Sequence, residues 1–372
     1  MNDNVFFSIA GIYRTIHGKD LKMPFTERIS KCREGIILGC GNPLLDIRAD
    51  VSNEFLKKWN LKENDAIIAD DQRIHMFREL VENYDVSYTP GGATLNSLRV
   101  CQWILNEPNR ATFFGCIGDD YYGNILKQKT QEASLNACFQ VRKDEKTGTC
   151  AALIINEHRS LCAHLAAANL FTVDHLEDAR NYDLIEKAQY FYISGFFLTV
   201  CPAAVISIAR HASERNKVFA TNLAAPFIPK HYRNEFLSIL PYVDILFGNE
   251  NEAETFADVN NYNINDLGKI CKKIAASPKV NKKRQRIIIF TQGSDPTIVF
   301  QDGTGIVEYP VTKLKHEEIV DTNGAGDAFV GGFLSQYIQN KSVTESIECG
   351  HYAAATIIRQ EGCTFPTSCL YH

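Results

Sequence analysis

The sequence lacks the cysteine and histidine patterns that bind zinc or build a disulfide framework. Its twelve cysteines are scattered from Cys32 to Cys369 without a C-x-x-C pair, and its ten histidines form no H-E-x-x-H cluster. Unpaired thiols of this kind are typical of a protein kept reduced in the cytosol. The sequence therefore predicts neither a structural zinc site nor a disulfide-rich secreted fold.

An uninterrupted membrane-length apolar run and an excess of positive charge are also missing. The most apolar stretch, from Phe191 to Ala209, is broken by Ser194-Gly195 and Cys201-Pro202, which predicts a strand, a loop and a helix. The net charge of −5 argues against broad attraction to nucleic acid or to an anionic membrane. The one basic run, Lys282 to Arg286, is best explained as a solvated loop, with a nuclear-import patch as the minority alternative.

The first 34 residues do not resemble a secretory signal. Asp3, Asp20 and Glu27 interrupt them, and they contain no sustained apolar core. We expect residues 1–34 to form a poorly ordered extension, followed by a domain over residues 35–372. The compartment that these features favour is the cytoplasm, with a nuclear pool as an alternative.

From about Ile36 onward, short apolar runs alternate with helix-like segments. The sequence predicts strands near 36–39, 112–117, 190–193, 218–221, 243–247 and 287–290. It predicts helices near 94–105, 121–133, 203–213, 250–256, 326–339 and 343–359. This alternation predicts an α/β fold whose mostly parallel central sheet is covered by helices on both faces. Residues 46–68 and 137–165 break the alternation and predict a small, mostly-β lid.

The most informative stretch runs from Asp321 to Phe329. It follows a strand-like apolar run that ends at Val320, and it opens a predicted helix. Small residues let the backbone approach a ligand, and the amides at a helix start favour an anion. A carboxylate in that place would repel phosphate unless it acts chemically, so Asp327 is a candidate general base facing a phosphoryl group. A glycine-rich turn with an acidic residue on the helix dipole is the structural alternative.

Two further motifs stand at predicted helix starts. Gly91-Gly92 precede a helix whose first turn carries Asn96, and together with Asp46 this amide suits a vicinal diol. An ordinary turn is the alternative. Asn249 and Glu252 begin another helix, where they form either a capping box or the surroundings of a hydrated magnesium ion and phosphate.

Phe196 and Phe197 follow a predicted strand, on the side of an open α/β sheet where ligands bind. They predict stacking on a flat base, with packing in the core as the alternative. Gly39-Cys40-Gly41 also follows a strand, but Leu44 replaces the third glycine of a dinucleotide fingerprint. This mismatch argues against an NAD-dependent oxidoreductase.

In this order, the motifs resemble the ribokinase-like (PfkB) family of carbohydrate and nucleoside kinases. Residues 321–334 match the C-terminal signature of the family, Gly91-Gly92 with Asn96 match the N-terminal one, and Asn249-x-x-Glu252 matches the magnesium motif. Further stretches, among them 41–46, 165–169 and 195–199, resemble members that phosphorylate adenosine, over nearly all of residues 36–366. The resemblance implies a ribokinase-like fold with a lid, usually monomeric. It also implies transfer of the γ-phosphoryl group of ATP, with Mg²⁺, to the 5′-hydroxyl of adenosine, a reaction of purine salvage.

The resemblance also assigns roles to individual residues. It implies that Asp327 is the general base and that an anion hole is formed by the amides of Gly324, Ala325 and Gly326. The residues that it places at the ribose are Asp46, Gly91, Gly92 and Asn96, with Asn42 and Asn323 nearby. The residues that it places around adenine are Leu44, Ile68, Cys150 and Phe197. It places toward ATP Arg159, Asn249, Thr291 and Gly293, with Asn249 and Glu252 holding magnesium through water.

One departure from the family concerns Ala93, where related enzymes often carry serine. The alanine removes a hydroxyl contact to the base and leaves base preference open. Three alternatives therefore remain: a kinase of another nucleoside or of a sugar, an NAD-dependent oxidoreductase, and a nucleoside-binding protein without turnover.

Overall fold

The computed structural model describes residues 32–63, 66–155, 158–301 and 303–371. Almost all of them belong to a compact unit that runs from Glu34 to His372. Apart from its last three residues, the predicted N-terminal extension, residues 1–34, lies outside the described part of the chain. Within the described ranges, no helix combines the length and the apolar character needed to cross a membrane.

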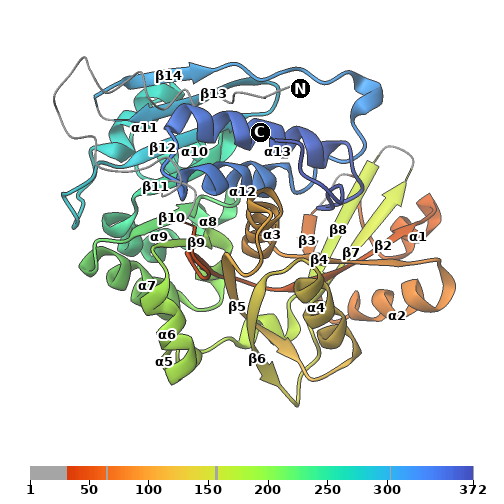
Figure 1. Ribbon diagram of the computed structural model, residues 1–372. Helices are drawn as coiled ribbons and strands as arrows, with labels where there is room; N and C mark the ends of the chain where they lie inside the picture. The colour runs from red at the N-terminus through yellow and green to blue at the C-terminus, as the bar shows by residue number, and fades with distance from the viewer. Residues whose placement is uncertain (1–31, 64–65, 156–157, 302, 372) are drawn as a thin grey trace, which may run out of the picture. The chain divides into compact units, whose positions relative to one another are not determined.

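The larger sheet is mostly parallel (Figure 1). Its strands, in spatial order, are β14 (Gly305–Tyr309), β13 (Asp295–Gln301), β12 (Ile287–Gln292), β11 (Ile245–Asn249), β10 (Val218–Asn222), β9 (Tyr190–Ser194), β1 (Ile37–Cys40), β5 (Ala111–Gly118) and β6 (Asn136–Arg142). Only the β12–β13 and β13–β14 pairs are antiparallel in this described sheet. Its central strands are fully buried apolar runs, as parallel strands covered on both faces must be.

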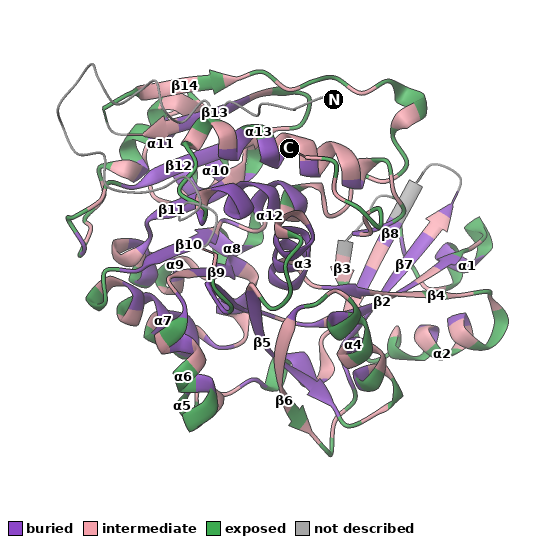
Figure 2. Ribbon diagram, in the orientation of Figure 1, coloured by how far each residue is buried: buried purple, intermediate pink, exposed green. Residues whose placement is uncertain are grey.

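Helices cover both faces of the larger sheet (Figures 1 and 2). Side chains alternate between faces along each strand, so Leu246 of β11 packs into the core formed with α7, α10 and α11, whereas the Phe247 ring contacts Phe329 and Phe333 of α12. The helices on the first side are α5 (Asp174–Glu177), α6 (Ala179–Lys187), α7 (Pro202–Glu214), α8 (Phe227–His231), α9 (Arg233–Ile239), α10 (Glu250–Val259) and α11 (Leu267–Ala275). The other side carries α3 (Ala93–Leu105), α12 (Ala325–Tyr337) and α13 (Val343–Ile358).

A second, smaller sheet has the strand order β3 (Ala66–Ile68), β8 (His158–His164), β7 (Thr149–Ile155), β2 (Leu44–Asp50) and β4 (Ser87–Gly91). Two helices, α1 (Asn53–Lys58) and α2 (Ile74–Asn83), pack on it through a core of their own. The predicted fold class, a mostly parallel sheet with a small second sheet, is confirmed.

The strands of the second sheet come from more of the chain than the predicted lid ranges. Both ranges contribute, through β2 and β3 and through β7 and β8, and β4 joins them by pairing Asp46 with Thr89. Within 137–165, β6 instead pairs with β5 in the larger sheet, where the rings of Phe113 and Phe139 are in edge contact. The helix α4 (Tyr121–Glu132) connects these two parallel strands.

The strand expected to end at Val320 is absent from the described chain, so this prediction was wrong. The segment contains only a short 3-10 helix, η7 (His316–Glu318), and the Val320 side chain is exposed. Its backbone has no neighbouring strand, because the amides of Val320 and Asp321 donate to the carbonyl of Ile358 at the end of α13. The apolar pattern was therefore not a sign of sheet pairing.

Two consecutive glycines let α12 fit tightly between α3 and α13. A Cβ on Gly331 would lie 2.4 Å from the Ser97 carbonyl oxygen of α3, and one on Gly332 would lie 2.5 Å from the Cys349 carbonyl oxygen of α13. Both obstacles are backbone atoms, which cannot rotate away. The position of α12, and hence of Asp327 on its first turn, depends on this close approach.

We expect Gly331→Ala to destabilise the protein by about 1–3 kcal/mol, because the added methyl forces two packed helices apart. Gly268→Ala on α11 is the matched control: the nearest atoms to its new Cβ are side-chain atoms at 3.3 Å or more, so only the helix preference of alanine acts. Urea unfolding of the two variants measures the difference. Equal stability of both would contradict the packing argument.

Candidate active site

Asp327 lies on the first turn of α12, directly after a left-handed residue. Gly324, the residue before the helix, has φ = +78°, a conformation that only glycine adopts without strain. The first amides of a helix have no partner within it, so those of Gly324 to Gly326 face outward, although Ala325 N makes a long 3.3 Å bond to Thr322 O. Among the described residues, and apart from the neighbouring backbone, no atom lies within 4 Å of a Cβ placed on Gly326. The loop therefore offers amides and open space beside a carboxylate.

The Asp327 carboxylate is held by a side chain from another helix. Asn96 Nδ2 donates to Asp327 Oδ2 at 3.1 Å, joining residues predicted separately from two motifs. Burial raises the pKa of Asp327 to about 7, the Asn96 bond lowers it, and the charges of Asp46 and Glu252 raise it. The side chain is nevertheless only half-buried, so a reacting hydroxyl can reach it.

The residues predicted at the ribose meet where the two sheets join. A Cβ on Gly91 would lie 2.2 Å from Asp46 Oδ1, and one on Gly92, where φ is +100°, would lie 2.1 Å from the Asn42 carbonyl oxygen. Among the described residues, the buried side-chain oxygens of Asn42 and Asn96 have no hydrogen-bond partner. Buried acceptors are almost always paired, so two orphans beside Asp46 mark a place where a polar ligand fits.

The residues predicted around adenine are only partly brought together. Leu44 faces Gly91 across β2 and β4, and Cys150 pairs with Asp46 across β2 and β7. Ile68, on β3, is an apolar side chain that is 63 % exposed.

Phe197 lies in a different environment from the one that base stacking requires. It belongs to η5 (Gly195–Thr199), it is 1 % exposed, and its ring packs edge-on against Phe171 in the main core. The structure thus shows the packing alternative for this ring, and its contact with a base stays a prediction.

The residues predicted toward ATP lie at the ends of two neighbouring strands. Asn249 of β11 pairs in register with Thr291 of β12, and Gly293, with φ = +57°, follows with open space around it. Asn249 and Glu252 form the capping box: Glu252 N donates to Asn249 Oδ1, and Asn249 N donates to Glu252 Oε2. Of Arg159 only the backbone, in β8, is described, and its side chain lies outside the described part.

Magnesium would be held indirectly by this pair. Within the described residues, no three His, Cys, Asp or Glu side chains gather into a direct metal cluster. Burial raises the pKa of Glu252 to about 7, although the Asn249 amide bond opposes the shift. Because the oxygens of Glu252 already accept bonds from Asn249, the pair would hold a hydrated cation through water.

Asp321 shapes the loop through its carboxylate, and the predicted side-chain contact of Asn323 with the ligand stays a prediction. The Asp321 carboxylate accepts from the amide of Asn323 at 2.9 Å and from the amide of Gly362 at 3.0 Å. A Cβ on Gly324 would lie 3.2 Å from Cys363 Cβ, so the turn at Gly362-Cys363 supports the loop from behind. Nothing in the residue types of this turn predicted its contact with the loop.

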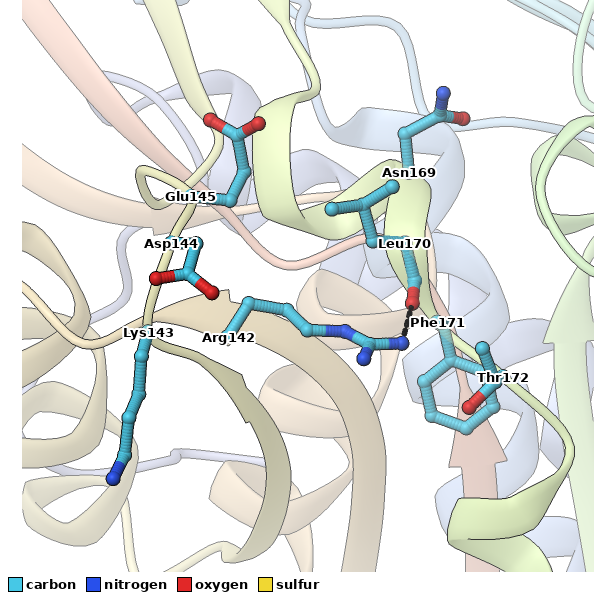
Figure 3. A pocket seen from close by; sticks show the side chains of 8 residues that line it. All are labelled: Arg142, Lys143, Asp144, Glu145, Asn169, Leu170, Phe171 and Thr172. Atoms are coloured by element: carbon cyan, nitrogen blue, oxygen red, sulfur yellow. Dashed lines mark hydrogen bonds between the residues drawn. The ribbon is translucent and has the colours of Figure 1, made fainter.

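A separate cavity has a volume of about 520 Å³, and one of its lining residues, Phe171, packs against Phe197 (Figure 3). It is lined by two segments, Arg142 to Glu145 and Asn169 to Thr172. The Arg142 side chain extends across it, and its Nη2 donates to the Leu170 carbonyl at 2.6 Å. None of the predicted site residues lines this cavity, and its mixed charges favour no single ligand.

Comparison with known proteins gives consistent matches over nearly the whole chain. Residues 54–369 match the pfkB family carbohydrate kinase. Adenosine kinase 2 of Arabidopsis thaliana is 45% identical over 333 residues, which cover 90% of this chain and 96% of that protein.

Solved structures give the same result. The crystal structure of Anopheles gambiae adenosine kinase in complex with P1,P4-di(adenosine-5) tetraphosphate has a TM-score of 0.86 and 48% sequence identity, covering 91% of this chain and 100% of that one. Adenosine kinase from Schistosoma mansoni in complex with adenosine and AMP has a TM-score of 0.83 and 34% identity, covering 90% and 98%.

We expect Asp327→Asn to gain stability over the wild type as pH rises. An unfolded chain releases this proton near pH 3.8, whereas the folded protein keeps it until about 7, so the wild type loses stability across that interval and not above it. The difference in free energy of unfolding between the variant and the wild type grows by at most about 1.4 kcal/mol for each pKa unit. Urea unfolding between pH 4 and pH 8 measures it.

Glu345→Gln is a control for which the pH dependence of stability should have the opposite sign. The Ser342 hydroxyl bond lowers the pKa of Glu345, so this carboxylate stabilises the fold above its unfolded pKa and stops doing so as pH falls. A pH-independent difference between Asp327→Asn and the wild type would show that the carboxyl is not desolvated.

Proposed function

The chain belongs to the pfkB family of carbohydrate kinases, and from that premise we propose how its residues phosphorylate adenosine. The enzyme is an ATP-dependent phosphotransferase that acts on adenosine. One observation carries the residue assignment: the half-buried Asp327 carboxylate, hydrogen-bonded to Asn96, stands beside the first amides of α12. A base and an anion-binding surface are thus side by side.

Asp327 serves as the general base. The oxygen of the adenosine 5′-hydroxyl attacks the γ-phosphorus of ATP, its proton passes to Asp327, and the bond between the γ-phosphorus and the bridging oxygen breaks to release ADP. A pKa of about 7 leaves the carboxylate half-ionised at neutral pH, where it is still basic enough to accept the proton. The Asn96 bond aims one carboxylate oxygen and leaves the other for substrate.

The rest of the catalysis comes from backbone amides and from the positioning of the substrates, since phosphoryl transfer requires little covalent chemistry from the protein. The amides of Gly324, Ala325 and Gly326 stabilise the charge on the transferring group. The ribose hydroxyls donate hydrogen bonds to Asp46. They also donate to the buried side-chain oxygens of Asn42 and Asn96, which have no hydrogen-bond partner among the described residues.

Asn249 and Glu252 would hold magnesium through water on the ATP side of the site, and its chemical contribution there would be to neutralise phosphate charge. The raised pKa of Glu252 supports this assignment, because a nearby cation removes the cost of its buried charge. Thr291 and Gly293, at the adjoining strand end, line the ATP side. Leu44, Ile68 and Cys150 surround the base, and Phe197 stacks on it.

We further propose that the enzyme works as a monomer in the cytoplasm, with a nuclear pool as an alternative. The thiols support a reducing compartment, because most of the twelve cysteines are buried. Its partners are adenosine and ATP, with neither nucleic acid nor membrane.

We expect Asp327→Asn to lower kcat by about 10²–10⁴-fold, since the amide cannot accept the proton. Adenosine binding, measured by calorimetry without ATP, should persist because Asp46 and the ribose contacts are unchanged. Asp321→Asn serves as the comparison. Its carboxylate accepts hydrogen bonds from two backbone amides, so this substitution should lower the melting temperature, and it should lower kcat less than Asp327→Asn does. Near-normal turnover in Asp327→Asn would remove the assigned role.

ADP release with adenosine, inosine, guanosine and ribose, each with and without magnesium, tests the substrate and the metal. We expect adenosine to give the highest kcat/KM and chelation of magnesium to abolish turnover. Ala93 and the buried Phe197 make the base contacts the least constrained part of the site. Equal kcat/KM for ribose and adenosine would show that the base is not recognised.

A further inference from the structure

Arg99 is a buried cation on the same helix as Asn96, and its acceptors are main-chain atoms. It is 7 % exposed, and its Nη1 donates to the carbonyl of Pro90 at 3.0 Å and to that of Cys363 at 3.2 Å. Its guanidinium lies over the ring of Phe365, 5.2 Å from the centroid. One side chain therefore connects segments that are more than 260 residues apart.

Both acceptors belong to the backbone beside the two glycine loops of the site. Pro90 immediately precedes Gly91 and Gly92, which lie against Asp46 and Asn42. Cys363 lies behind Gly324, and the preceding Gly362 amide bonds the Asp321 carboxylate of the anion-hole loop. A shift of the guanidinium would thus move the ribose loop, Gly91-Gly92, relative to the anion-hole loop, Gly324 to Gly326.

A second side chain of α3 fixes the same C-terminal segment. Trp103 lies one helical turn after Arg99, its Nε1 donates to the Pro366 carbonyl at 2.9 Å, and its ring stacks on Phe365 at 5.2 Å. The segment is therefore anchored to α3 even without Arg99. What Arg99 adds is the link from that anchored segment to Pro90.

The charge of Arg99 is costly in this position. Burial lowers the pKa of Arg99, and only the nearby Cys363 and Asp46 favour its charged form. A buried ionic group of this kind is weak evidence for stability, since apolar side chains of similar size are often as stabilising. The geometry of the hydrogen bonds from Arg99 to Pro90 and Cys363 indicates a role other than stabilisation.

We propose that Arg99 is a positioning residue that sets the spacing between the ribose loop, Gly91-Gly92, and the anion-hole loop, Gly324 to Gly326. It touches no substrate. It fixes the distance over which the 5′-hydroxyl meets the phosphoryl group, and this role rests on the proposed function.

The test compares Arg99→Met, Arg99→Lys and a control variant, Arg286→Met. Arg286 is also buried, at 1 %, and also donates only to backbone carbonyls, among them those of Leu240 and Val243, but it lies away from both loops. Thermal unfolding, adenosine and ATP binding by calorimetry, and kcat and KM are measured for each, all well below the melting temperatures.

We expect Arg99→Met to weaken adenosine binding and to lower kcat, by about 10- to 100-fold in kcat/KM, because small misplacements of reacting groups are costly. Arg99→Lys, whose ammonium can donate to both carbonyls, should recover most of that loss. Arg286→Met should lower the melting temperature without changing adenosine affinity or kcat of the folded enzyme.

Wild-type kinetic constants in folded Arg99→Met, or equal defects in Arg286→Met, would overturn the proposal. If Arg99→Met does not fold, Arg99→Gln replaces it, because the amide keeps one donor group without the charge. A loss in kcat/KM relative to the wild type, smaller than the one expected for Arg99→Met, then supports the proposal. Wild-type kinetic constants in Arg99→Gln reject it. If the wild type releases no ADP with adenosine, the proposed function fails, while the calorimetric comparison still decides whether Arg99 aligns the two loops.

Discussion

The site depends on one hydrogen bond between two helices, from Asn96 of α3 to Asp327 of α12, at 3.1 Å. The two side chains belong to motifs 231 residues apart, so their meeting is a consequence of helix packing. That packing depends in turn on Gly331, because any Cβ there would strike the Ser97 carbonyl. A backbone contact that only glycine permits therefore holds Asp327, the proposed general base, against Asn96.

The same region gathers negative charge at a cost to stability. The charges of Asp46 and Glu252 add to burial in raising the pKa of Asp327, and burial alone is the main cause for Glu252. A fold selected for stability would have no reason to bring these carboxylates together. In the proposed function, the ribose hydroxyls and a hydrated cation would offset part of this cost.

The sequence predicted the strand and helix order well, since apolar runs and helical spacing are local properties. It failed where an apolar pattern had no partner strand, as at Val320, and it did not find β4, whose Pro90 and Gly91 are poor strand formers. For Phe197 it left stacking and core packing open, and the structure shows core packing. Arg99 was missed because an arginine in a helix gives no sequence sign of burial.

By itself, the sequence determined the α/β class, the motifs and the type of chemistry, because glycine loops, a helix start and an acidic residue can be recognised from local order. The tertiary structure decided which motifs meet: Asn96 with Asp327, Asn249 with Thr291, and the turn at Gly362 with the loop at Gly324. The physical reason is that strand register and helix approach are fixed by side-chain volume and backbone contacts between distant segments, which no local pattern records.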